Sequence, residues 1–113
     1  MTSDEVANLV RQQIGNRWDQ SNAHGVDLQR CLVQPKRVQM GAMGASIPNP
    51  GGKAVDTKVW VWVVLEEDPV KRDGYKIVME EDTREFGLAI LLADGQPCYL
   101  GCYGDFMTTL QAM

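Results

Sequence analysis

The chain has 113 residues, of which 44 % are hydrophobic and 23 % charged, and its formal net charge is −4. This length predicts a single domain over residues 1–113 with enough apolar side chains for a core, so the composition argues against disorder along the whole chain. The negative charge argues against nucleic acid as a partner, because phosphates demand a basic surface.

The cysteines and the N-terminus bear on the cellular compartment. The three cysteines are Cys31, Cys98 and Cys102, an odd number that does not form a disulfide framework. Cys98 and Cys102 would lie about 13 Å apart on a strand, beyond disulfide reach. The N-terminus lacks the basic start and apolar run of a signal peptide, and no apolar run approaches the roughly 20 residues of a membrane span. We therefore expect a soluble cytoplasmic protein with reduced thiols and no membrane association.

The first predicted element is an amphipathic helix. Thr2 and Glu5 fit a capping box, in which each side chain bonds to a backbone N–H near the helix start. Turn-forming residues at 19–25 are expected to end the helix. Apolar residues at i+4 steps form one stripe, which comprises Val6, Val10, Ile14 and Trp18, with Leu9 beside it.

Residues 26–40 are expected to be extended, although Pro35 lies among them. Because proline cannot donate to a strand ladder, we predict an edge strand or an interrupted one. Residues 41–57 are rich in glycine and proline, which predicts a long mobile loop or a loosely ordered hairpin connection.

Four further strands are predicted in the second half of the chain, joined by short turns. Asp105 is expected to cap a short C-terminal helix. The fold class is therefore α+β, an antiparallel four- to five-stranded meander sheet flanked by an N-terminal helix and a short C-terminal helix. The predicted strands are residues 59–67, 75–82, 86–93 and 97–103, with turns at residues 68–74, 83–84 and 94–95.

Turn lengths fix the pairing of these strands. Residues 94–95, Asp-Gly, are a strong two-residue hairpin signal, and a second two-residue turn is predicted at residues 83–84. The register that follows pairs Ala93 with Gln96, Leu91 with Cys98, Ala89 with Leu100, Met79 with Leu88, Ile77 with Ile90, Val63 with Met79 and Leu65 with Ile77.

This register sorts the side chains onto two faces of the sheet. The predicted core face, on which the helices are expected to pack, carries Val59, Val61, Val63, Leu65, Tyr75, Ile77, Met79, Phe86, Leu88, Ile90, Leu92, Tyr99 and Tyr103. The other face, the predicted docking face, carries Trp60, Trp62, Val64, Val78, Gly87, Ala89, Leu91, Cys98, Leu100 and Cys102, interrupted by Lys76 and Glu80.

The predicted docking face needs a cover. Its small central residues leave room for an approaching group, and tryptophans beside such a hollow are typical of contact surfaces. Trp60 and Trp62 would expose a large apolar area if they remained in water. Three covers are open: a terminal helix that crosses to this face, a second copy of the chain, or a ligand or different protein.

Little in the sequence indicates catalysis. The lone histidine, His24, lies in a turn-rich segment without a nucleophile at a related spacing, and we interpret it as a turn residue. Cys98 and Cys102 lack the closer spacing and additional ligands of a zinc site, and we expect them to be buried thiols. We predict no catalytic residue, no metal ligand and no cofactor.

Two acidic runs, residues 66–68 and 80–82, resemble a divided metal site. In a meander, however, they fall at opposite edges of the sheet, since the end of one strand lies beside the start of the next. Glu66 is instead expected to pair across the strands with Lys76.

The function predicted from these patterns is a non-catalytic protein-binding or assembly module, such as an adaptor, a chaperone-like protein or an inhibitor. The predicted docking face would be its contact surface, for a protein partner or a homodimer. The alternative is a small-molecule-binding protein or enzyme. Its pocket would lie between the face of Trp60 and Trp62 and the loop at residues 41–57, with Cys98, Cys102 or Tyr103 as polar lining.

Overall fold

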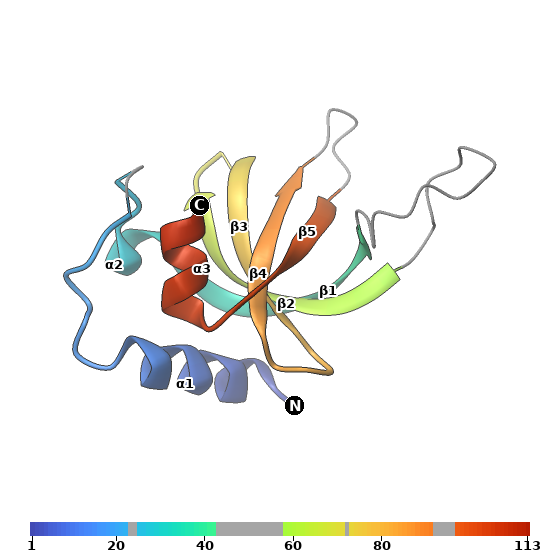
Figure 1. The fold of residues 1–113 in the computed structure, drawn as a ribbon, viewed down its shortest axis with the longest axis horizontal. Coiled ribbons are helices and arrows are strands. Elements are labelled where there is room, and N and C mark those ends of the chain that lie inside the picture. Colours follow the sequence, from blue (N-terminus) through green and yellow to red (C-terminus); the bar gives the residue numbers. More distant parts are fainter. Residues whose placement is uncertain (23–24, 43–57, 72, 92–96) are drawn as a thin grey trace.

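The computed structural model describes residues 1–22, 25–42, 58–71, 73–91 and 97–113. They form an α+β fold, which confirms the predicted class (Figure 1). Predictions for His24, for most of the loop at residues 41–57 and for the pairing of Ala93 with Gln96 lie outside the described residues. The elements are α1 (Ser3–Ile14), α2 (Leu28–Cys31), β1 (Leu32–Ala42), β2 (Lys58–Asp68), β3 (Asp73–Glu80), β4 (Phe86–Leu91), β5 (Pro97–Gly104) and α3 (Phe106–Ala112).

Both terminal helices begin at the predicted caps. The Thr2 side chain accepts a hydrogen bond from the backbone N–H of Glu5 at 3.2 Å, and Asp105 accepts one from Thr108 at 2.8 Å. Helix α1 ends earlier than its apolar stripe, because Gly15 adopts a positive φ of 60° at its C-terminus. Trp18 nevertheless packs against the core from the following segment.

The segment at residues 26–40 is not extended throughout. Asp27 caps a short helix, α2, by accepting a hydrogen bond from the backbone N–H of Gln29 at 2.9 Å. Strand β1 then begins at Leu32 and continues past Pro35, which lies in an irregular part of the strand. The proline is accommodated because two extra residues of β1 lie opposite β2 between the pairs Leu32–Leu65 and Lys36–Val63.

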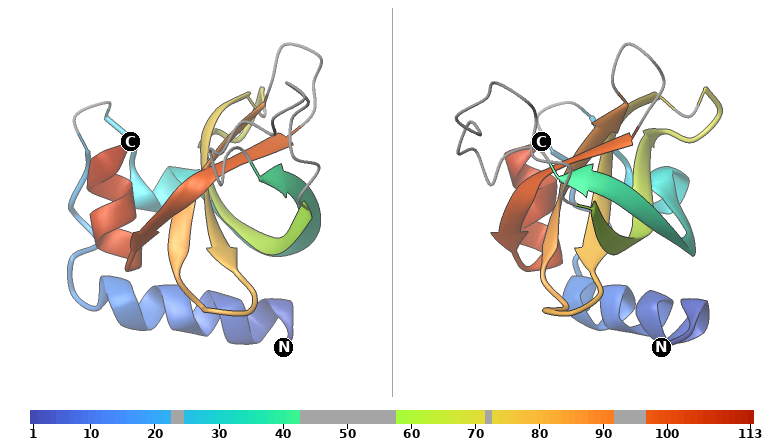
Figure 2. Two further views of the ribbon diagram at one scale, coloured as in Figure 1. Left: turned by 45° about the vertical axis from the view of Figure 1, so that its right-hand side comes forward. Right: turned by 90° about the vertical axis from the view of Figure 1, so that its right-hand side faces the viewer.

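The meander closes into a barrel, which the sequence patterns do not predict. Consecutive strands pair antiparallel in the order β1–β2–β3–β4–β5, and β1 also runs parallel to β5. Two residue pairs, Gly41–Cys98 and Ala42–Tyr99, make this closing contact. Figures 1 and 2 show the curved strands enclosing an interior, with α1 and α3 outside. The sheet therefore has an inner and an outer surface.

Two apolar clusters follow from this closure. Helix α1 contacts β1 and β2, and α3 contacts β3, β4 and β5 from outside. The cluster that we call the outer core lies beneath the helices and comprises Val6, Val10, Ile14, Val26, Leu28, Cys31, Trp62, Val64, Leu65, Ile77, Met79, Phe86, Leu88, Phe106, Met107 and Leu110. The cluster that we call the inner core comprises Met40, Val61, Val63, Val78, Ala89 and Tyr99.

The register of β2 against β3 is partly as predicted. Leu65 pairs with Ile77 as expected, but Val63 pairs with Val78 rather than Met79, so Val64 is an extra residue in β2. This bulge changes the alternation, because Val64 and Leu65 both face the outer core. The residues of β2 that precede the bulge therefore lie on the surface opposite to the predicted one.

The hairpin of β3 and β4 has a longer loop than predicted. Ile77 pairs with Leu88 and Met79 with Phe86, a shift of two residues from the prediction. Glu80 donates its N–H to the Glu85 carbonyl at 2.8 Å, which leaves residues 81–84 as the loop instead of a two-residue turn. A shift of two does not change which surface a side chain faces.

Strand β5 is displaced by one residue against β4, and this changes its faces. Leu91 pairs with Pro97 rather than Cys98, and Ala89 pairs with Tyr99 rather than Leu100. Tyr99 consequently lies with Ala89 in the inner core. A displacement by an odd number of residues places each following side chain on the opposite surface of the sheet. A bulge restores the original alternation.

The predicted assignment of side chains to a core face and a docking face is therefore wrong for several residues. Trp62 and Val64, assigned to the docking face, lie in the outer core with Ile77 and Leu88. Val61, Val63 and Tyr99, assigned to the core face, lie inside the barrel with Val78 and Ala89. The β2 bulge and the shift of β5 are the physical causes.

Candidate functional site

The residues of the predicted docking face do not share one surface in the structure. Trp62 and Val64 are buried under the helices, while Val78 and Ala89 are buried inside the barrel. Cys98 is buried, and Leu100 packs partly buried against the outer core. Leu91 belongs to β4 through its pairing with Pro97. Among the members whose burial the structure describes, Trp60 and Cys102 are exposed.

Trp60 lies on the outer surface of the barrel beside charged groups. The residue is 43 % exposed, and the Arg37 guanidinium lies 3.8 Å from the centroid of its ring. Arg37 also donates two hydrogen bonds, of 2.8 and 3.0 Å, to the Glu81 carboxylate. This hydrogen bonding lowers the pKa of Glu81 and raises the pKa of Arg37. The arrangement holds an exposed indole flat against a cation.

A pocket opens at one end of the barrel. We call it the barrel-mouth pocket; its volume is about 540 Å³. Its walls come mainly from β1 and β2, with contributions from the β2–β3 turn and from β3 and β5. The lining residues are Val33, Gln34, Lys36, Val38, Met40, Val63, Glu66, Pro69, Lys76 and Pro97.

Two irregularities in neighbouring strands shape this pocket. The two extra residues of β1 lie between Leu32 and Lys36, and the bulge of β2 lies at Val64. Because the bulge resets the alternation, Leu65 packs in the outer core and Glu66 lines the pocket. In a regular strand these two side chains would have exchanged places. Bulges commonly redirect a side chain in this way next to binding sites.

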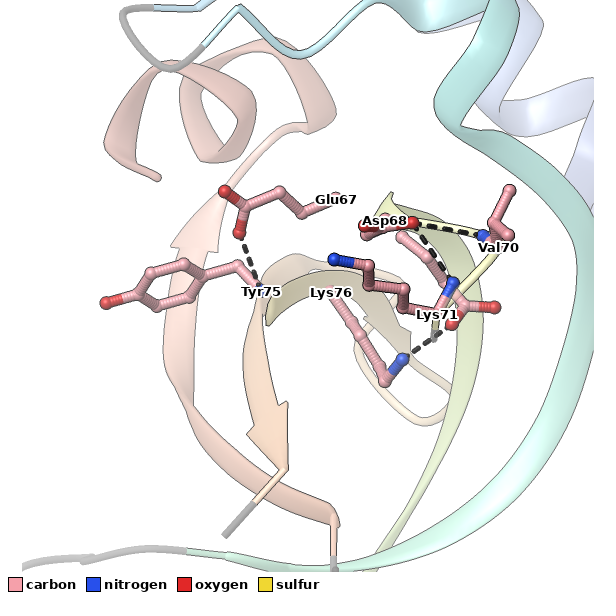
Figure 3. Close-up of polar contacts among 7 residues, drawn as sticks. Glu67, Asp68, Val70, Lys71, Tyr75 and Lys76 are labelled. Carbon is pink, nitrogen blue, oxygen red and sulfur yellow. Dashed lines mark hydrogen bonds and ion pairs between the residues drawn. The ribbon is translucent and has the colours of Figure 1, made fainter. Parts of the chain in front are cut away.

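The central polar feature of the pocket is an ion pair between Glu66 and Lys76. Lys76 Nζ lies 2.6 Å from Glu66 Oε2, and only 8 % and 5 % of the two side chains are exposed. The residues are cross-strand partners, as predicted, and the pair is buried. Figure 3 shows Lys76 projecting from β3 into the space that the strands surround.

Burial of this ion pair carries an unfavourable desolvation free energy. Removing each ion from water costs several kcal/mol, and the attraction between them repays that cost only with good geometry. Replacing such a pair with apolar side chains of similar volume is often neutral or stabilising. Stability alone therefore gives little reason for an ion pair at this place in the barrel.

The two carboxylates that follow Glu66 have different surroundings. Glu67 accepts a hydrogen bond from the backbone N–H of Tyr75 at 2.9 Å. Asp68 accepts from the N–H groups of Val70 and Lys71 at 3.2 and 3.1 Å (Figure 3). These contacts fix the β2–β3 turn that carries Pro69 to the pocket. The acidic run thus provides one pocket carboxylate and two that order the turn.

Gly74, at the start of β3, has a conformation that favours glycine. Its φ is +80°, and a Cβ there would lie 2.7 Å from Glu67 Oε2. Both observations favour glycine, because other residues rarely adopt this conformation.

A second polar cluster contains Tyr99 and Cys102. The Tyr99 hydroxyl donates to Glu80 at 3.3 Å, and the Cys102 thiol donates to Glu85 at 2.9 Å. Desolvation, followed by the nearby carboxylates, raises the pKa of both groups. Cys102 is exposed, contrary to the prediction of a buried thiol, because it lies near the end of β5. A raised pKa keeps this thiol protonated and weakly nucleophilic.

The described parts of the chain contain no group of three His, Cys, Asp or Glu side chains arranged to hold a metal ion. Within those same residues, no helix has the length and apolar character needed to cross a membrane. Cys31, Cys98 and Cys102 are all free.

Comparisons of this chain with protein-family models, with curated proteins and with solved structures find no match. The site is therefore characterised by its own geometry. The sequence signal that could have located it is the Glu66–Lys76 pairing, which the strand pattern predicts. Its burial could not be inferred, because that depends on the bulge at Val64.

Proposed function

We propose that this chain is a small-molecule-binding barrel whose ligand occupies the barrel-mouth pocket. The observation that carries the proposal is the buried Glu66–Lys76 pair in a pocket of about 540 Å³. Ligand pockets measure about 300–1,000 Å³ and combine apolar walls with a few polar groups that orient the ligand. Val33, Val38 and Met40 are among the apolar wall residues here.

Small-molecule binding is the alternative function that the sequence predicts, but the pocket proposed here has a different lining. The polar lining consists of Glu66, Lys76, Lys36 and Gln34 rather than Cys98, Cys102 or Tyr103. We propose binding rather than catalysis, because the pocket lining offers no cysteine, serine or histidine among the described residues.

A fragment screen with a pocket-filling variant tests the proposal. Ligands would be detected by chemical-shift changes in two-dimensional NMR spectra of the full chain. Val38→Phe adds a ring to the pocket wall and should abolish binding of the fragments that the wild type binds. Val70→Phe is the matched control, because Val70 lies on the adjacent turn with 92 % of its surface exposed. Binding that survives Val38→Phe unchanged, or a screen without any hit to the wild type, would refute the proposed site.

Protein binding or assembly, including a homodimer, is the second candidate function. The observation that favours it is the exposed Trp60 held by Arg37 on the outer barrel surface. Tryptophan and arginine are enriched in the energetically dominant parts of protein interfaces. Light scattering after size-exclusion chromatography should then give a dimer mass for the wild type and a monomer mass for Trp60→Ala. A monomeric wild type would leave only a different protein as the partner on this surface.

A cytoplasmic location is also a proposal. It is supported by the three free cysteines, since reducing compartments preserve thiols.

A further inference from the structure

Strand β1 closes the barrel over only a short part of its length. It pairs continuously with β2 from Lys36 to Gly41, whereas it pairs with β5 at Gly41 and Ala42 alone. Figure 2 shows β1, in green, meeting β5, in orange, near the end of β1. Because β5 begins at Pro97, no strand within the described parts of the chain lies beside the second edge of residues 36–40. We call this segment of β1 the open edge.

The open edge borders the barrel-mouth pocket. Lys36, Val38 and Met40 alternate along it, and all three line the pocket. The intervening residues, Arg37 and Gln39, are exposed, as the alternation of a strand requires. An unpaired edge presents backbone N–H and C=O groups with which another strand can pair. A strand added here would therefore direct every second side chain toward the pocket.

The charge at Lys36 restricts what such a strand can carry. Lys36 is exposed, and among the residues that the structure describes no carboxylate lies within ion-pair distance of its ammonium group. An acidic side chain directly opposite Lys36 on an added strand would form a favourable cross-strand pair. Apolar side chains would suit the two positions opposite Val38 and Met40.

We infer that the open edge binds an extended peptide segment of another protein, in which two apolar residues and one acidic residue alternate with polar ones. Peptide strands that add to sheet edges gain affinity from main-chain hydrogen bonds and specificity from pockets for alternate side chains. Antiparallel pairing is slightly more stable per residue than parallel pairing, and it places the acidic residue after the apolar ones. The inference goes beyond the proposed function, because the affinity comes from backbone pairing outside the pocket.

A short synthetic peptide tests the inference. The probe is acetyl-Thr-Leu-Thr-Leu-Thr-Glu-Thr-amide, whose leucines would lie opposite Met40 and Val38 and whose glutamate would lie opposite Lys36. In two-dimensional NMR spectra of the full chain, the peptide should shift the amide signals of residues 36–40 in a saturable way. The signals of residues 77–79 are the internal control, because β2 and β4 pair with that segment on both sides.

Methylation of the peptide amides distinguishes strand pairing from contacts of the side chains alone. Every second residue of an edge strand directs its N–H toward the neighbouring strand, and the others direct it away. Two further peptides with the same side chains therefore carry N-methyl groups on alternate sets of amides. One should lose about tenfold or more in affinity, because several hydrogen bonds are removed, while the other should bind like the parent peptide.

A charge reversal tests the register. Lys36→Glu should weaken binding of the parent peptide on the order of threefold, because the cross-strand pair becomes repulsive. A peptide with lysine in place of its glutamate should bind Lys36→Glu more tightly than it binds the wild type. Lys58→Glu is the matched control, since Lys58 is exposed on β2 and does not line the pocket. This control should keep the preference for the parent peptide.

The outcomes separate the peptide site from the small-molecule function. Absence of saturable shifts at residues 36–40, or equal binding of the two methylated peptides, would overturn the inference and leave the fragment screen to decide the small-molecule function. A wild-type dimer whose open edge excludes the peptide would assign this edge to a second copy of the chain. Peptide binding with the expected methylation pattern, together with a fragment screen without hits, would support the open edge and refute the small-molecule function.

Discussion

Trp60 and Trp62 stand two residues apart on the outer side of β2, yet 43 % of Trp60 is exposed and only 6 % of Trp62. Trp62 packs in the outer core under the helices, whereas Trp60 lies beyond that cluster and stacks on Arg37. The same residue type on the same strand surface therefore has a structural role at one position and is available for contact at the other.

Alanine substitutions should separate these two roles. Trp62→Ala removes a large side chain from the outer core and should lower the free energy of unfolding by about 3–5 kcal/mol. Trp60→Ala should cost about 1 kcal/mol or less, because its site is on the surface. Urea denaturation followed by circular dichroism measures both. Similar losses at the two positions would contradict the assignment of Trp62 to the core.

The buried ion pair should show strong coupling between its partners. Lys76→Met alone leaves a buried carboxylate without that cation and should cost about 3–5 kcal/mol in unfolding free energy. The double variant Glu66→Leu/Lys76→Met should recover most of this loss, since apolar replacements of buried pairs are often tolerated. Urea unfolding of the four members of the cycle measures the coupling.

The exposed pair of Arg37 and Glu81 is the comparison for that cycle. The corresponding substitutions Arg37→Met and Glu81→Leu should be nearly additive, because solvent screens exposed pairs. Additivity at Glu66 and Lys76 as well would mean that water reaches the pocket pair as freely as the surface pair.

Gly87 allows two strands and a tyrosine to approach closely. A Cβ at this position would lie 2.1 Å from the Gly101 carbonyl oxygen and 2.7 Å from the Tyr99 ring. Gly87→Ala should therefore destabilise the fold by about 1–3 kcal/mol through overpacking. Gly41→Ala is the matched control in β1, where an added Cβ meets nothing within 4 Å, and should be nearly neutral. Thermal denaturation of the two variants checks the difference; equal melting temperatures would contradict it.

The Arg37–Glu81 contact should be visible in acid titration. Hydrogen bonding from Arg37 lowers the pKa of Glu81 below its ordinary value of about 4.3. A lowered folded-state pKa means that the stabilisation is present above the unfolded-state value and is lost as the pH falls through the folded-state value. Carbon-detected NMR titration should give a higher Glu81 pKa in Arg37→Met than in the wild type. An unchanged Glu81 pKa would show that the contact is not maintained in solution.

Local patterns predicted the elements well. Thr2 and Asp105 cap helices as expected, because a capping side chain bonds to a backbone group only a few residues away. The four strands of the second half of the chain are within about two residues of their predicted limits, since alternation and turn residues are local properties, whereas β1 begins well after the predicted start at residue 26. The Leu65–Ile77 and Glu66–Lys76 pairings were also predicted from the turn between their strands.

Local patterns did not predict the surfaces on which side chains lie. An extra residue at Val64 and a displacement of one residue between β4 and β5 each reverse the alternation. Strand sequences do not specify such single-residue changes, because loop lengths and contacts between distant strands decide them. For this reason the proposed contact surface around Trp60 and Trp62 contained residues that the structure separates.

The sequence by itself determined the α+β class, the caps, the strand segments and the partner of Glu66 across the sheet, because each depends on residues close together along the chain. The tertiary structure decided the closure of β1 against β5, the burial of Trp62 and the inward direction of Glu66. Closure and burial depend on which distant segments meet, and this selection is a property of the whole packed chain. The pocket lies where two local irregularities, in β1 and β2, face one another across these paired strands, and residues of β3 and β5 complete its wall.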